Sequence, residues 1–273
     1  MSAFADITAT GASAGNRVTN AIAMASRRTG VDFAYLLGQA KIESSLNPTA
    51  RATTSSATGL YQFVDQSWLA VIDRHGSEYG LGWAADAISR GSNGHYHVSD
   101  PDLRQQILDL RKHPETASVM AAEHAADNKA TLEQRLGREA EPVDLYMAHF
   151  LGVGGASKFL AMNDRAPGAS AASMFPAAAR ANRSIFYDRQ GNARSFAEIR
   201  DRFASKLQKG VDSIDGGDIQ YVDNALPSGA KTVQPADYVR IETQRLATAA
   251  DVTVRPEPQT ARLAYLMLAT LGR

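Results

Sequence analysis

The sequence is most informative at residues 33–48, FAYLLGQAKIESSLNP, and at residues 57–63, ATGLYQF. The first stretch begins with an apolar, helix-like run and brings one carboxylate, Glu43, to the end of that run. Two serines and then Pro48 follow, and these residues disfavour a continuing helix. A carboxyl at such a junction is partly desolvated and can still reach a ligand, so it can stay protonated and act as a general acid. For an isolated glutamate the ordinary interpretation is a solvated helix end, and the neighbouring segments decide between the two.

Two ordered segments resemble the catalytic motifs of the soluble lytic transglycosylases, which share the goose-type lysozyme fold. The first segment is Glu-Ser-Ser-Leu-Asn-Pro at 43–48 with Ser-Ala-Thr-Gly-Leu-Tyr-Gln-Phe at 56–63. It is similar to the family pattern Glu-Ser, an apolar residue, Asn/Asp-Pro, a spacer, and then Ala-x-Gly-Leu-Met-Gln. The second segment, Ala-His-Phe-Leu-Gly at 148–152, is similar to a later Ala-Tyr-Asn-x-Gly segment of the family. The domain that these motifs imply covers roughly the first two-thirds of the chain.

The sequence departs from the family pattern at three places. The spacer between Glu43 and Gly59 is one residue longer than the commonest family form, and the usual Met is Tyr61. The Tyr-Asn pair of the second motif is replaced by His149 and Phe150. These differences leave the acid in place and affect how the N-acetyl group and the neighbouring sugar rings would be held.

The resemblance implies an all-α, lysozyme-like domain with a groove for peptidoglycan glycan strands, and no cofactor. Glu43 would protonate the β-1,4 link between N-acetylmuramic acid and N-acetylglucosamine. It would then act as base while the muramoyl 6-hydroxyl closes onto C1, giving 1,6-anhydromuramic ends. No second acid stands beside Glu43 in the sequence, which favours this reaction over hydrolysis by two carboxylates. The substrate-binding residues expected around the acid are Ser44, Ser56, Gly59, Tyr61, Gln62, Tyr146, His149 and Tyr187.

Other interpretations stay open. A hydrolytic lysozyme, such as a phage endolysin-type muramidase, would use the same fold with a spatially distant Asp as partner. A non-catalytic wall-binding protein would keep the fold without turnover, and an intact Glu43 with Gly59–Gln62 argues against it. For Tyr146 and Tyr187, the ordinary interpretation is a core or rim tyrosine.

Composition narrows the class of protein. The chain has 273 residues, no cysteine, and 29 basic against 29 acidic side chains, so its formal net charge is zero. Zero charge gives no electrostatic argument for nucleic acid, and the lack of cysteine excludes disulfides and thiolate chemistry. His95 and His97 flank Tyr96 without a third ligand nearby, so no metal site is expected.

Localisation follows from the expected substrate. No run reaches the ~20 apolar residues of a membrane span, and residues 1–20 lack the pattern of a Sec signal. The expected location is the periplasm or cell wall, reached by phage release or through a secretion or flagellar apparatus.

Three regions are expected: a flexible leader at 1–15, the catalytic domain at 16–209, and a linker with a helical extension at 210–273. The extension ends in an apolar stripe that could dock onto a protein partner. Expected caps are Asp32 and Ser67, and the sequence Ser99-Asp100-Pro101 is expected to start a helix. The Gly-rich turn at 152–155 is expected to allow close backbone approach, either between helices or to a sugar lining the groove. The expected helices span residues 17–28, 32–43, 68–75, 84–88, 114–136, 142–151, 169–180 and 195–208, with another starting at Pro101.

Overall fold

The structure is a computed structural model that describes residues 17–213. The expected leader at 1–15 and nearly all of the expected extension at 210–273 lie outside these residues, so those two predictions are not addressed. Within the described part the chain is mainly helical with one short hairpin, which confirms the all-α class.

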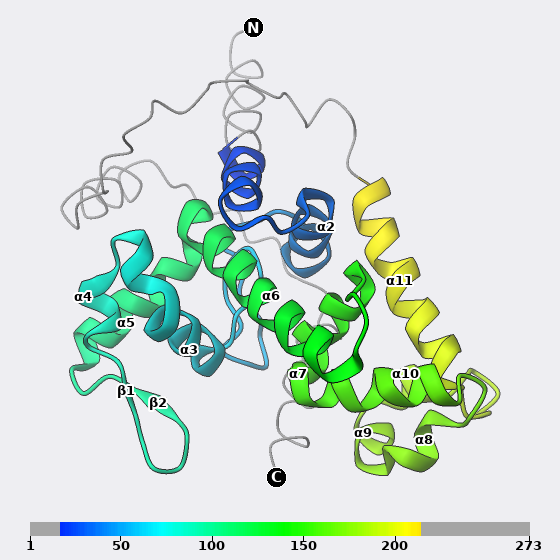
Figure 1. Cartoon of the computed structure of the whole chain (residues 1–273). Coiled ribbons are helices and arrows are strands. Elements are labelled where there is room, and N and C mark those ends of the chain that lie inside the picture. Colours follow the sequence, from blue (N-terminus) through cyan, green and yellow to red (C-terminus); the bar gives the residue numbers. More distant parts are fainter. Residues whose placement is uncertain (1–16, 214–273) are drawn as a thin grey trace, which may run out of the picture.

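One long helix, α6, lies at the centre of the described structure. In Figure 1, α6 crosses the middle of the molecule, with α3, α4, α5 and the hairpin on one side and α8–α11 on the other. The two strands pair antiparallel, with Ser89 opposite His97 and Arg90 opposite Tyr96. After helical residues 17–29, the elements are α2 (Phe33–Ser44), α3 (Asp65–His75), η1 (Gly76–Tyr79), α4 (Gly82–Ala85), β1 (Ser89–Arg90), β2 (Tyr96–His97), α5 (Pro101–Asp109), η2 (Leu110–Lys112), α6 (Pro114–Leu136), α7 (Pro142–Arg165), α8 (Ala171–Met174), α9 (Pro176–Ala181), α10 (Arg183–Phe186) and α11 (Phe196–Asp212).

Several helix boundaries confirm the sequence prediction because local capping chemistry sets them. The Asp32 carboxylate accepts a hydrogen bond from the Tyr35 backbone N–H at 2.7 Å and starts α2. Asp100 caps α5 in the same way. Helix α6 runs from Pro114 to Leu136 and ends at Gly137, whose φ of 69° is left-handed.

The predicted cap at Ser67 is wrong. Helix α3 already begins at Asp65, and the backbone N–H of that residue donates to the Ser56 hydroxyl at 3.2 Å. The N-cap residue is Val64, which has no capping side chain. The first helical N–H is instead satisfied by a loop residue nine positions earlier, which a search for local capping residues does not find.

Two further elements differ from the prediction for similar reasons. The segment expected to be mostly loop contains the β1–β2 hairpin, whose two-residue strands are too short to show an alternating pattern. The single helix expected over 169–180 is divided into α8 and α9, because Phe175 precedes Pro176 and adopts non-helical backbone.

The α2–α11 crossing holds the end of the chain's described part against the first motif. A Cβ on Gly210 would lie 2.9 Å from the backbone oxygen of Gly38 and 2.8 Å from Ile42 Cγ1. The predicted end of this helix at residue 208 is therefore wrong, because α11 continues through Gly210 to Asp212, four residues further. Gly210 allows the two helices to contact closely and does not end α11.

The break after Leu151 is confirmed, and one of its two expected purposes is wrong. Gly152 has φ 68° and ψ 152° inside α7, and a Cβ there would meet nothing within 4 Å in the described structure. The glycine is needed for this backbone conformation and not for close approach between helices, while close approach of a sugar stays a prediction.

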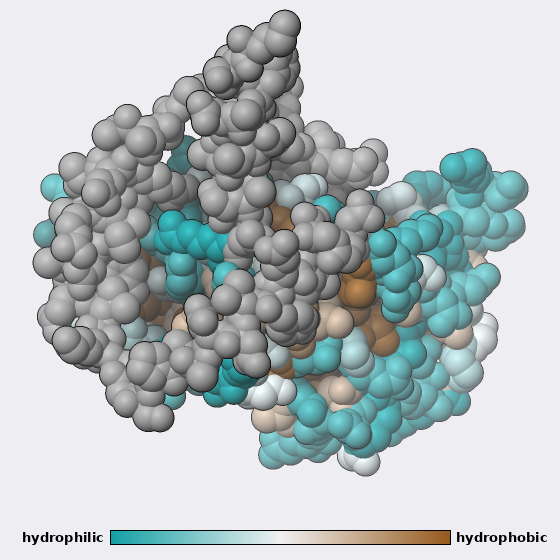
Figure 2. Space-filling view, turned by 90° about the horizontal axis from the view of Figure 1, so that it is seen from above, coloured by the Kyte–Doolittle hydropathy of each residue, from teal (hydrophilic) through white to brown (hydrophobic). Residues whose placement is uncertain are grey.

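Among the described residues, the large hydrophobic side chain that is exposed is Met174, at 50%. The one face drawn in Figure 2 shows hydrophilic residues over most of its coloured area, with some hydrophobic areas between them. None of the helices between residues 17 and 213 is long and apolar enough to cross a membrane.

Candidate active site around Glu43

Glu43 lies in the last turn of α2 and is only 4% exposed. Tyr146, from α7, donates its hydroxyl to Glu43 Oε1 at 3.5 Å, and His149 Nε2 lies 3.9 Å from the same oxygen. Burial raises the pKa of the Glu43 carboxyl to about 7, although Lys206 and the Tyr146 hydroxyl favour the charged form. A carboxyl with this pKa is about half protonated at neutral pH, so it can donate and accept a proton there.

The turn after Glu43 is held by the backbone and by Ser44. Ser45 and Leu46 have left-handed φ values of 54° and 63°, which end the helix. The Ser44 hydroxyl lies 3.0 Å from the Ala40 backbone oxygen and 2.8 Å from that of Leu60, and it can donate to either. The structure therefore places Ser44 as a link between the two halves of the first motif, with its hydroxyl used on backbone oxygens.

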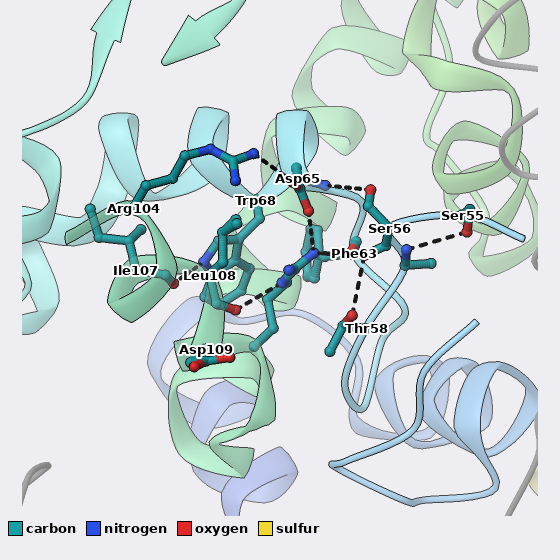
Figure 3. Close-up of polar contacts among 12 residues, drawn as sticks. Ser55, Ser56, Thr58, Phe63, Asp65, Trp68, Arg104, Ile107, Leu108 and Asp109 are labelled. Atoms are coloured by element: carbon teal, nitrogen blue, oxygen red, sulfur yellow. Dashed lines mark hydrogen bonds and ion pairs between the residues drawn. The ribbon is translucent and has the colours of Figure 1, made fainter. Parts of the chain in front are cut away.

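Arg111 organises the loop that carries the second half of the motif. Its Nη1 lies 2.9 Å from the backbone oxygens of Ser56 and Phe63 and from Asp65 Oδ1. Its Nε donates to the Leu108 oxygen, also at 2.9 Å. Figure 3 shows these contacts joining the loop, the start of α3 and the end of α5. This buried guanidinium thus fixes residues 56–65 relative to the helices.

Gly59 is required at the point where this loop meets Arg111. Its φ is 86°, and a Cβ would lie 2.0 Å from the Arg111 backbone oxygen. Gly59, predicted as a substrate-binding residue, is therefore needed for a contact with the protein's own backbone.

Tyr61 and Gln62 are both buried. The Tyr61 side chain is fully enclosed in the core. Gln62, with φ 50°, donates its amide to the oxygens of Ala50 and Gly59 at 3.2 and 3.0 Å. Its Oε1 is a buried acceptor for which the described residues supply no donor. The buried Tyr61 hydroxyl likewise has no hydrogen-bond partner among the described residues, so both side chains of this pair hold an unpartnered oxygen.

The remaining predicted residues separate into two groups. Tyr146 and His149 are brought to Glu43, as described above. Ser56 is exposed and uses its hydroxyl on Asp65, and Tyr187 lies at the end of α10 with Arg183 4.8 Å over its ring. The contacts recorded for Tyr187 in the described structure are with its own neighbourhood, so the structure does not bring it to the acid.

His149 and Lys206 differ in charge although both lie near the acid. Burial lowers the pKa of His149 to about 3, with His124 and Lys206 acting in the same direction, so the imidazole is neutral at working pH. Lys206 Nζ lies 5.9 Å from the ring centroid of Tyr146 and 5.3 Å from that of Phe150. Burial and the Glu43 charge raise the pKa of Tyr146 well above its usual value.

Arg111 and Lys206 are the two site residues that sequence reasoning missed. Arg111 gave one signal, because it is a charged residue among Leu108, Leu110 and other apolar neighbours. Lys206 gave none, since α11 carries several other basic residues.

A metal centre has no support in residues 17–213, where no group of three His, Asp or Glu side chains is placed to hold an ion. His97 belongs to the hairpin and is exposed, as is His95 beside it. A scan of the chain against protein-family models finds no family that matches.

Proposed function

We propose that the protein is a peptidoglycan lytic transglycosylase with a lysozyme-like fold and Glu43 as its acid and base. The observation that carries this proposal is the buried Glu43 carboxyl with a pKa of about 7. The described groups that perturb this pKa are Lys206 and Tyr146, and neither is a second carboxylate. A hydrolase of the two-carboxylate type would need another acid about 5–9.5 Å away, so a reaction that uses one acid twice fits better.

In the first step, protonated Glu43 donates its proton to the glycosidic oxygen while the bond from C1 to that oxygen breaks. In the second step, the Glu43 carboxylate takes the proton of the muramoyl 6-hydroxyl while O6 bonds to C1. The acid is regenerated and no water is consumed, which gives a 1,6-anhydro ring. The Tyr146 hydroxyl, at 3.5 Å from Oε1, stabilises the carboxylate between the two steps.

The partner in this proposal is a glycan strand of peptidoglycan, and the site of action is the periplasm or cell wall. Gln62 stays a predicted sugar contact because it belongs to the first motif, although its Oε1 is buried in the described structure.

The test is digestion of purified peptidoglycan followed by mass spectrometry of the soluble muropeptides. We expect products about 18 Da lighter than the hydrolytic ones, since one water is not added in a proton-neutral closure. Glu43→Gln should abolish their release while the protein stays folded. Products with reducing muramic ends would identify a hydrolytic lysozyme instead. Binding to the wall without any soluble product would identify a non-catalytic wall-binding protein.

A further inference from the structure

We propose that Lys206 is a positioning residue of this acid site, whose ammonium group, held over two aromatic rings, stabilises the carboxylate form of Glu43. The inference rests on the proposed function, because it assigns Lys206 to the moment when Glu43 must act as base. The effect of the Lys206 charge on the titration of Glu43 can be measured without any substrate.

The packing of three helices places the ammonium group at the site. Helix α11 contacts both α2, which carries Glu43, and α7, which carries Tyr146. The rings of Tyr146, Phe150 and Phe203 pack edge to face, with centroids 5.4 to 5.9 Å apart. Lys206 Nζ lies within 6 Å of two of these ring centroids, the range in which a cation is attracted to an aromatic face.

The position of α11 is fixed one turn after Lys206. There a Cβ on Gly210 would lie 2.9 Å from the backbone oxygen of Gly38, so the two helices are in close contact at this point. The ammonium group is therefore presented by a rigid element, with only its own side chain left to move.

The charges around Glu43 single out Lys206. In the described residues, the titratable groups that face Glu43 are Tyr35 of its own helix, Tyr146 and His149 of α7, and Lys206 of α11. Burial raises the pKa of both tyrosines and lowers that of His149, so these three groups are neutral near pH 7. Lys206 is then the cation that acts on the carboxylate, and it lowers the pKa of Glu43.

This arrangement suits an acid that works twice. Burial alone favours protonated Glu43, which is the form that donates, and disfavours the carboxylate that must exist next. The Lys206 ammonium group, held over the rings of Tyr146 and Phe150, lowers the free energy of the Glu43 carboxylate. Removing the charge should leave the donor form intact and make the base form harder to reach.

The first measurement is a ¹³C NMR titration of the glutamate carboxyls, with the Glu43 signal assigned by its absence in Glu43→Gln. In Lys206→Met, which keeps a long apolar stem, the Glu43 midpoint should move to higher pH. Lys209→Met is the matched control, because Lys209 is an exposed lysine on the same helix, and it should leave the midpoint unchanged. Lys206→Arg, which keeps the charge, should restore the wild-type midpoint. Lys206→Gln serves as a second neutral variant if the methionine variant does not fold.

The second measurement is the pH profile of muropeptide release. In Lys206→Met the alkaline limb should move upward by the same amount as the NMR midpoint, a change that a purely structural role would not produce. An unchanged NMR midpoint in a folded neutral variant would overturn the inference. If wild-type protein releases no muropeptides, the proposed function fails, and the NMR midpoint alone still decides whether Lys206 acts on Glu43.

Discussion

Replacing Arg111 by methionine removes the group that joins the motif loop to the helices. The guanidinium is 6% exposed and contacts three backbone oxygens and the Asp65 carboxylate, each at 2.9 Å. Breaking a buried ion pair by removing one partner costs about 3–5 kcal/mol. Asp65 keeps a second partner, Arg104 at 2.6 Å, so its charge is not left alone. We therefore expect a loss near the lower end, about 3 kcal/mol of unfolding free energy.

The assay is urea unfolding followed by circular dichroism, with thermal unfolding as a second measure. A loss of about 3 kcal/mol in a domain of this size lowers the melting temperature by roughly 6–12 °C. The matched control is Arg104→Met. Its side chain is 38% exposed and pairs with the same carboxylate, so it should cost no more than about 1 kcal/mol. Equal losses in the two variants, or a loss below about 1 kcal/mol for Arg111→Met, would refute the assignment of Arg111 as the loop's anchor.

Two further predictions concern Glu43 and the α2–α11 crossing. The raised pKa of Glu43, about 7 against an ordinary 4.5, means that its contribution to stability is fully present below about pH 4.5 and is lost as the pH rises through about 7. The unfolding free energy of Glu43→Gln, relative to that of the wild type, should therefore rise by roughly 3 kcal/mol from pH 4 to pH 8 in urea unfolding. The same difference between variant and wild type at both pH values would contradict this prediction. Gly210→Ala should destabilise by about 1–2 kcal/mol, because overpacking against Gly38 exceeds the helix preference for alanine. Gly154→Ala, where a Cβ has its nearest neighbour at 3.9 Å, should stabilise by about 0.5–1 kcal/mol, and the reverse order would refute the packing argument.

Elements that depend on neighbours in the sequence could be predicted. The start of α2 at Asp32 and the ends of α6 follow from caps, proline and glycine within a few residues. The place of Glu43 in the last turn of α2 could be predicted because the helix and the residues that end it are consecutive in the sequence.

Elements that depend on residues far apart in the sequence could not be predicted. The Ser56 hydroxyl satisfies the first N–H of a helix nine residues later, and Arg111 satisfies a loop 48 to 55 residues earlier. Tyr146 and Tyr187 are both candidates on sequence grounds, and only the fold brings Tyr146, and not Tyr187, to Glu43. Lys206 acts through space and ring faces, for which a sequence carries no local pattern.

The residues around Glu43 are synthesised at different times. Glu43 is made early in synthesis, Tyr146 follows 103 residues later, and Lys206 comes later still. Before α7 and α11 have been made, the Glu43 carboxyl lacks Tyr146, His149 and Lys206, the groups that lie near it in the folded protein. On the proposed function, a chain truncated before α7 should therefore release no muropeptides.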